Sequence, residues 1–180
     1  MKLHDCCLLK KFFSDVFVPD NKGFYRVQRP VSESDIIQAA KSLLNERLKR
    51  EEALVDYQEI KDFLMVQMSD HYETLSALFL DAAGLIAFEW MFSGRLDTYS
   101  ALLPRHVARS ALEVNATKVI LAHSTAPGQP RPVQADRDIA KRVQDTLGTL
   151  EIEFDYCFIS DGRVISLTEW GFLKKPHATP

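Results

Sequence analysis

The sequence predicts a mixed α/β domain preceded by a short helical segment. Apolar residues recur at helical spacing over residues 32–48, whereas from residue 73 onward they alternate, as in β-strands. Length and composition agree, because 180 residues suit one domain and a hydrophobic content of 46% can fill its core. The net charge of -3 does not favour binding to nucleic acid through bulk charge.

Two helices are expected in residues 31–69, after an irregular arm over residues 1–30. The first helix begins near Ser32, which can cap it while Asp35 faces the positive end of the helix dipole. The second helix begins near Asp56 and carries one apolar stripe. Together they form the helical segment that precedes the main domain.

Strands dominate the main domain, which we place at residues 70–173, before a short tail over 174–180. Alternating residues at 73–81 and 85–94 surround a glycine turn and predict an antiparallel hairpin. The apolar run at 118–123 predicts a strand that is buried on both faces. The other expected elements are a helix opened by Pro104, a helix over 133–149, and two strands joined by a turn at 160–162.

Cysteine use and hydropathy predict a reduced, cytoplasmic protein. Cys6 and Cys7 are adjacent and Cys157 falls in an expected strand, so the three cysteines lack the spacing of a disulfide framework. No apolar stretch is long enough to span a membrane, and the N-terminus lacks the features of a signal peptide.

A candidate metal site follows the buried strand, in the sequence ILAHSTAPGQPRPVQAD at 120–136. A loop and a helix N-terminus can converge on a ligand at such a strand end. His123 and Asp136 are residue types that bind metals, and Thr125 and Val133 stand between them in the spacing H-x-T-x7-V-x2-D.

With histidine at 125 and serine at 133, this spacing would be H-x-H-x7-S-x2-D, the signature of the JAB/MPN (JAMM) metalloproteases. The chain resembles the RadC-like branch of that family over roughly residues 32–173. The segments that carry the resemblance are YETLSALFLDAAGLIAFEWMFSGRLD, LPRHVARSALEVNATKVILAH and PGQPRPVQADRDIAKRVQDTLGTLEIEFDYCFISDGRVISLTEWGFL. The resemblance implies a JAB/MPN-like (cytidine-deaminase-like) fold, in which helices flank a mixed sheet.

The resemblance also implies roles for single residues. In active members, two histidines, the aspartate and a water hold a catalytic zinc ion, and His123 and Asp136 match two of these ligands. Glu73 matches the general base that takes a proton from the zinc-bound water. Thr125 replaces the second histidine, and Val133 replaces the serine that stabilises the oxyanion.

The remaining site residues also have structural interpretations. Asp136 falls in the first turn of an expected helix, where a carboxylate is stabilising without a metal. His123 can satisfy backbone groups at a strand end, and Glu73 can be a charge at a strand edge. A further departure from the RadC-like pattern is Tyr156, which stands where the branch often has histidine.

We therefore expect a RadC-like protein with an incomplete zinc site, which acts as a non-catalytic binding or scaffold protein for a protein partner. Zinc, if bound, is expected to bind weakly. The alternative is a zinc-dependent metallopeptidase or isopeptidase with a non-standard third ligand. A DNA-repair role is a second alternative that only the branch name suggests, because the charged run at 46–52 interleaves both signs and is typical of a solvated helix face.

If the loop from 123 to 136 has kept its geometry, Thr125→His would place a second imidazole beside that of His123, since residues i and i+2 of an extended segment point to the same side. We expect such a change to raise zinc affinity at least about tenfold.

Overall fold

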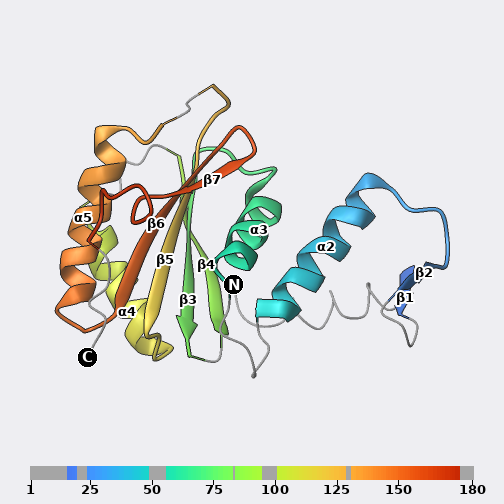
Figure 1. Cartoon of the computed structure of the whole chain (residues 1–180), viewed down its shortest axis with the longest axis horizontal. Coiled ribbons are helices and arrows are strands. Elements are labelled where there is room, and N and C mark those ends of the chain that lie inside the picture. Colours follow the sequence, from blue (N-terminus) through green and yellow to red (C-terminus); the bar gives the residue numbers. More distant parts are fainter. Residues whose placement is uncertain are drawn as a thin grey trace.

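A computed structural model describes residues 16–19, 24–48, 56–82, 84–94, 101–128 and 131–174. Figure 1 shows helices on both sides of a central sheet, with α4 and α5 on one side and α3 on the other. Cys6, Cys7, most of the charged run at 46–52 and residues 175–180 lie outside the described residues. Within the described part of the chain, no helix is long and apolar enough to cross a membrane.

The central sheet is mixed, as the sequence predicts, and has the order β4-β3-β5-β6-β7. Only β5 and β6 run parallel, while the other neighbouring pairs are antiparallel. The strands are β3 (Thr74–Asp81), β4 (Gly84–Ser93), β5 (Lys118–Ser124), β6 (Glu153–Ser160) and β7 (Arg163–Ser166). The expected hairpin is therefore confirmed as β3 and β4.

Four helices are described, and each begins within two residues of its expected start. They are α2 (Glu33–Leu48), α3 (Tyr57–Met68), α4 (Leu103–Glu113) and α5 (Gln134–Gly148). The Ser32 hydroxyl accepts a hydrogen bond from the Asp35 amide, and the Asp35 carboxylate accepts one from the Ser32 amide, so both halves of a capping box are made. Asp56 caps α3 by accepting from the Gln58 amide.

The arm differs from the expected irregular segment where the structure describes it. Phe17–Pro19 (β1) and Tyr25–Val27 (β2) pair as a small antiparallel sheet. Three-residue strands are too short for an alternating pattern to stand out from irregular sequence. Mixed charge, Pro19 and Gly23 therefore dominate the sequence signal of this segment.

Two apolar layers form on the two faces of the sheet, and β5 contributes to both. Val119 and Leu121 pack with α4 and α5, whereas Ile120 and Ala122 pack with α3. The expected burial of this strand on both faces is confirmed. Because side chains alternate along a strand, the His123 side chain lies on the same face as Leu121, towards α5.

Candidate functional site

The candidate site lies where β5 ends and α5 begins. His123, at the end of β5, and Asp136, in the first turn of α5, are brought together as the sequence predicts. The His123 Nδ1 lies 2.7 Å from Oδ1 of Asp136, which is hydrogen-bonding distance. Both side chains are buried, with exposed fractions of 4% and 0%.

A tyrosine completes the group. The Tyr156 hydroxyl of β6 donates to the same Asp136 Oδ1 at 2.8 Å, and the Val133 amide donates to Oδ2 at 2.8 Å. Both carboxylate oxygens of Asp136 therefore accept hydrogen bonds, from three donors on β5, β6 and the start of α5. Sequence reasoning noticed Tyr156 only as a departure from the RadC-like pattern.

The protonation states follow from this geometry. Burial alone would raise the pKa of Asp136, but the hydrogen bonds from His123, Tyr156 and the Val133 amide outweigh it and hold this pKa below its usual value. Burial, and then the charge of Asp136, raise the pKa of Tyr156 well above its usual value. The site is therefore an ionised carboxylate that accepts hydrogen bonds from three donors.

The imidazole of His123 is oriented by Asp136. A carboxylate only accepts hydrogen bonds, so Nδ1 carries the proton and Nε2 carries a lone pair in the neutral ring. Nε2 is buried and has no hydrogen-bond partner within the described part of the chain. The ring of Phe158 meets that of His123 edge-on, at a centroid distance of 6.4 Å.

Thr125 is buried and directed at the neighbouring strand. Its amide donates to the Ile159 carbonyl at 3.1 Å, which continues the pairing of β5 with β6 by one residue. Its hydroxyl donates to the same carbonyl at 3.4 Å. Thr125, which replaces the second histidine, therefore uses its hydroxyl to hydrogen-bond the backbone of β6.

Glu73 lies beside the same loop, directly before β3. Its Oε1 accepts a hydrogen bond from the Ala126 amide at 3.0 Å, so the carboxylate holds the loop that follows Thr125. The backbone of Glu73 has a φ of 50°, in the left-handed region that few residues other than glycine adopt. Its carbonyl accepts from the Gly94 amide at 2.7 Å, which ties the start of β3 to the end of β4.

Val133 is the N-cap residue of α5 and is half exposed. Its amide donates to Asp136, which is one half of a capping box. The other half needs a side-chain oxygen at the N-cap, and valine has none. The helix therefore begins without the side-chain acceptor that a serine would supply.

The residues present do not fit a zinc site of the expected kind. A zinc site of that kind takes three protein ligands, and Thr125, at the position of the third, donates its hydroxyl to the Ile159 carbonyl. Among the described residues, no three His, Cys, Asp or Glu side chains are grouped so that they could hold a metal ion.

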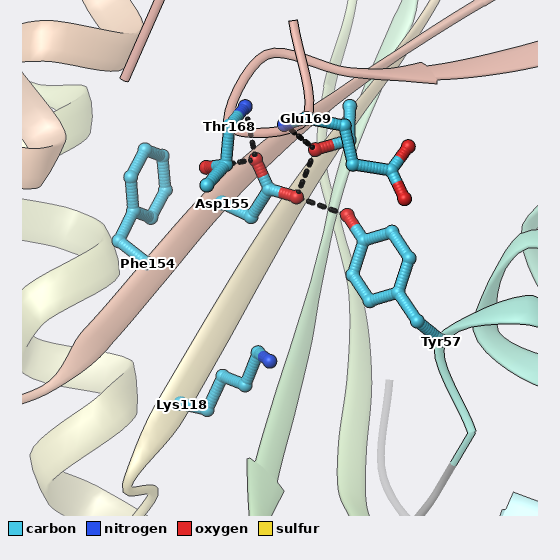
Figure 2. Close-up of a pocket in the computed structure, with 7 residues that line it drawn as sticks. Tyr57, Lys118, Phe154, Asp155, Thr168 and Glu169 are labelled. Carbon is cyan, nitrogen blue, oxygen red and sulfur yellow. Dashed lines mark hydrogen bonds between the residues drawn. The ribbon is translucent and has the colours of Figure 1, made fainter. Parts of the chain in front are cut away.

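A second polar cluster lies on the other face of the sheet, around Asp155. Figure 2 shows its carboxylate between Tyr57 and the turn after β7, beside a pocket of about 190 Å³. The carboxylate accepts from the hydroxyls of Tyr57, Ser166 and Thr168, and from the Thr168 amide. Burial, followed by the charges of Cys157 and Asp155, raises the pKa of Tyr57, which keeps it a donor.

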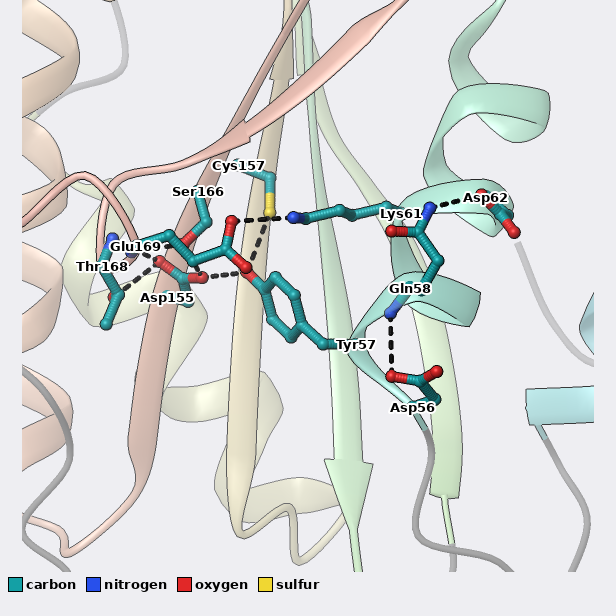
Figure 3. A network of polar contacts seen from close by, with 10 residues as sticks. All are labelled: Asp56, Tyr57, Gln58, Lys61, Asp62, Asp155, Cys157, Ser166, Thr168 and Glu169. Carbon is teal, nitrogen blue, oxygen red and sulfur yellow. Dashed lines mark hydrogen bonds and ion pairs between the residues drawn. The ribbon is translucent and has the colours of Figure 1, made fainter.

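Figure 3 shows how the same cluster joins α3 to the turn after β7, where Lys61 pairs with Glu169 at 2.7 Å. Because donors surround the Asp155 carboxylate, this cluster connects structural elements and offers no free ligand. Sequence reasoning missed it. The available signal was an aspartate in the middle of a strand, between Phe154 and Tyr156, which requires buried hydrogen-bond donors nearby.

Comparison with known proteins agrees with this fold. The model of the family described as "RadC-like JAB domain" matches residues 54–172, a range that includes α3 and the whole central sheet. A UPF0758 protein of Ectopseudomonas mendocina (strain ymp) is 37% identical over 141 residues, which are 77% of this chain and 62% of that protein.

A UPF0758 protein of Vibrio vulnificus (strain YJ016) is 35% identical over 179 residues, which are 95% of this chain and 78% of that protein. The chain thus spans less than two thirds of the length of the first of these relatives. With a family match over more than half of the sequence and relatives above 30% identity, the chain belongs to the RadC-like JAB domain family.

Proposed function

We propose that this chain is a non-catalytic member of the RadC-like JAB family, which acts by binding a protein partner. The observation that carries the proposal is the closed hydrogen-bond group around Asp136. His123, Tyr156 and the Val133 amide occupy the carboxylate that would otherwise bind the metal. A hydrolytic zinc needs three protein ligands and an open position for water.

Two further features support the absence of hydrolysis. Metal-assisted hydrolysis needs a general base close to the metal-bound water, and one oxygen of the Glu73 carboxylate, Oε1, is engaged by the Ala126 amide. Stabilisation of an oxyanion needs a donor, and the side chain of Val133 has none. The changes at Thr125, Glu73 and Val133 affect the metal ligands, the general base and the oxyanion donor. Each of them supports the proposed loss of hydrolysis.

Apolar side chains beside the site support a binding role. Val133 and Phe172 are 46% and 48% exposed. The guanidinium of Arg137 lies 4.8 Å from the Phe172 ring centroid and donates to the carbonyl of Pro132, which precedes Val133 in the chain. Exposed apolar side chains that form one patch mark contacts with other macromolecules, and Val133 and Phe172 are the residues that we propose for such a contact.

Metal analysis tests the proposal directly. We expect protein purified without chelator to carry well under one zinc per chain, as measured by atomic absorption. His106→Ala is a matched control for His123→Ala, because His106 is exposed on α4 whereas His123 is buried. Near-stoichiometric zinc that is lost in His123→Ala and kept in His106→Ala would refute the proposal and favour the zinc-dependent metallopeptidase.

A further inference from the structure

The hydroxyl of Tyr156 lies beside the carboxylate of Asp136 because of the register of β6 against β5. In the parallel pairing of β5 with β6, Tyr156 is opposite Leu121 and Phe158 is opposite His123. Tyr156 and His123 therefore lie on the same face of the sheet, two positions apart along the strands. From there the tyrosine, which is fully buried, reaches Oδ1 of Asp136 at 2.8 Å.

This hydroxyl competes with any metal for Asp136. Oδ1 already accepts from His123 Nδ1, and Oδ2 accepts from the Val133 amide. A cation that approaches Oδ1 must displace the imidazole proton, the tyrosine hydroxyl or both. Towards a carboxylate the Tyr156 hydroxyl can only donate, so while it stays in place it occupies a lone pair of Oδ1.

We propose that Tyr156 is the residue that withholds Asp136 from metal, so that the metal site is closed by Tyr156 as well as by the absence of a histidine at position 125. The inference rests on the proposed loss of zinc binding and adds a second determinant to it. Tyr156 acts through Asp136 and is a positioning residue.

The Tyr156 hydroxyl and the absence of a histidine at position 125 together predict how zinc affinity changes from variant to variant. In Thr125→His, a second imidazole is present but Asp136 stays held, so we expect a zinc affinity within about threefold of wild type. This is less than the tenfold gain that the motif alone predicts. In Thr125→His/Tyr156→Phe, the hydroxyl is removed and the ring is kept. We then expect zinc to bind at least about tenfold more tightly than to the single variant, since a hydrogen bond to a charged group is worth that much or more.

Competition against a chromogenic zinc chelator measures these affinities. Tyr57→Phe in the Thr125→His background is a matched control, because it removes a tyrosine hydroxyl from another buried carboxylate, Asp155, on the opposite face of the sheet. We expect no gain from it. Tyr156→Met is a second donor-free variant in the same background, with the same expected gain as Tyr156→Phe, and circular dichroism checks that each variant is folded.

Three results would overturn the role of Tyr156. These are a Thr125→His variant that already binds as tightly as the donor-free variants, folded donor-free variants that gain nothing, and a gain of equal size in the Tyr57→Phe control. A wild-type chain that binds zinc tightly is a different outcome. It would refute the proposed function itself, whatever the variants do.

Discussion

The hydrogen-bond group around Asp136 should make this residue a major contributor to stability. In Asp136→Asn the side chain keeps its shape but loses its charge, and one acceptor oxygen becomes an NH₂ donor. The three groups that now donate to the carboxylate would then compete for a single oxygen. Leaving a buried hydrogen-bond donor without its acceptor costs about 1–3 kcal/mol, above the roughly 0.3–1 kcal/mol of an exposed charge in the first turn of a helix.

Urea unfolding at pH 7 measures the effect. With a slope of roughly 2 kcal/mol per molar urea, the midpoint of Asp136→Asn should fall by about 0.5–1.5 M. Asp138→Asn is the matched control, because Asp138 is exposed on the same helix and accepts from Gln134 one turn away. The control should change stability by less than about 0.5 kcal/mol.

The same pair of proteins gives a pH test. The pKa of Asp136 is lowered in the folded chain, so its contribution is present above the unfolded pKa of about 3.9 and is lost as the pH falls through the folded value. The difference between wild type and Asp136→Asn should therefore hold from pH 7 to about pH 5 and shrink below about pH 4. Equal midpoints for Asp136→Asn and Asp138→Asn, or a difference that grows in acid, would refute the reasoning.

Two further predictions concern helix starts. Val133→Ser supplies the missing N-cap acceptor of α5 and should raise the free energy of unfolding by about 0.5–1 kcal/mol, measured by urea midpoint; an unchanged midpoint would contradict the capping argument. At α2, hydrogen bonds from Arg29 and from the Ser32 amide hold the pKa of Asp35 at about 2. A carboxyl-carbon NMR titration should show that value in wild type and a clear rise towards the usual one in Arg29→Gln, and no rise would assign the shift to Ser32 alone.

Periodicity was sufficient for most of the fold because each main element carries its own pattern. The hairpin at 73–94 and the buried run at 118–123 were found for this reason. The juxtaposition of His123 with Asp136 was predictable too. In a parallel β5-α5-β6 connection, the helix runs back along the sheet, so it begins near the end of β5. The short pair β1 and β2 was not predictable, because three residues cannot show a period.

The contacts of Tyr156 and Asp155 were beyond reach of the sequence for a different reason. Alternation states which face of a strand a side chain occupies, and Tyr156 reads as one more core aromatic between Phe154 and Phe158. Whether its hydroxyl finds an acceptor depends on where α5 sits above that face. Asp155 likewise depends on Tyr57, a residue 98 positions earlier in the chain.

A buried carboxylate must be neutralised or surrounded by donors, and this requirement explains how the site can remain closed without an ion. If Asp136 had lost its metal and gained nothing, an unpaired charge would remain in a fully buried position, at a cost of several kcal/mol. The Tyr156 hydroxyl, the His123 imidazole and the Val133 amide supply that compensation from β6, β5 and the start of α5. The same three contacts join those elements, so the group can hold the scaffold together through a buried charge.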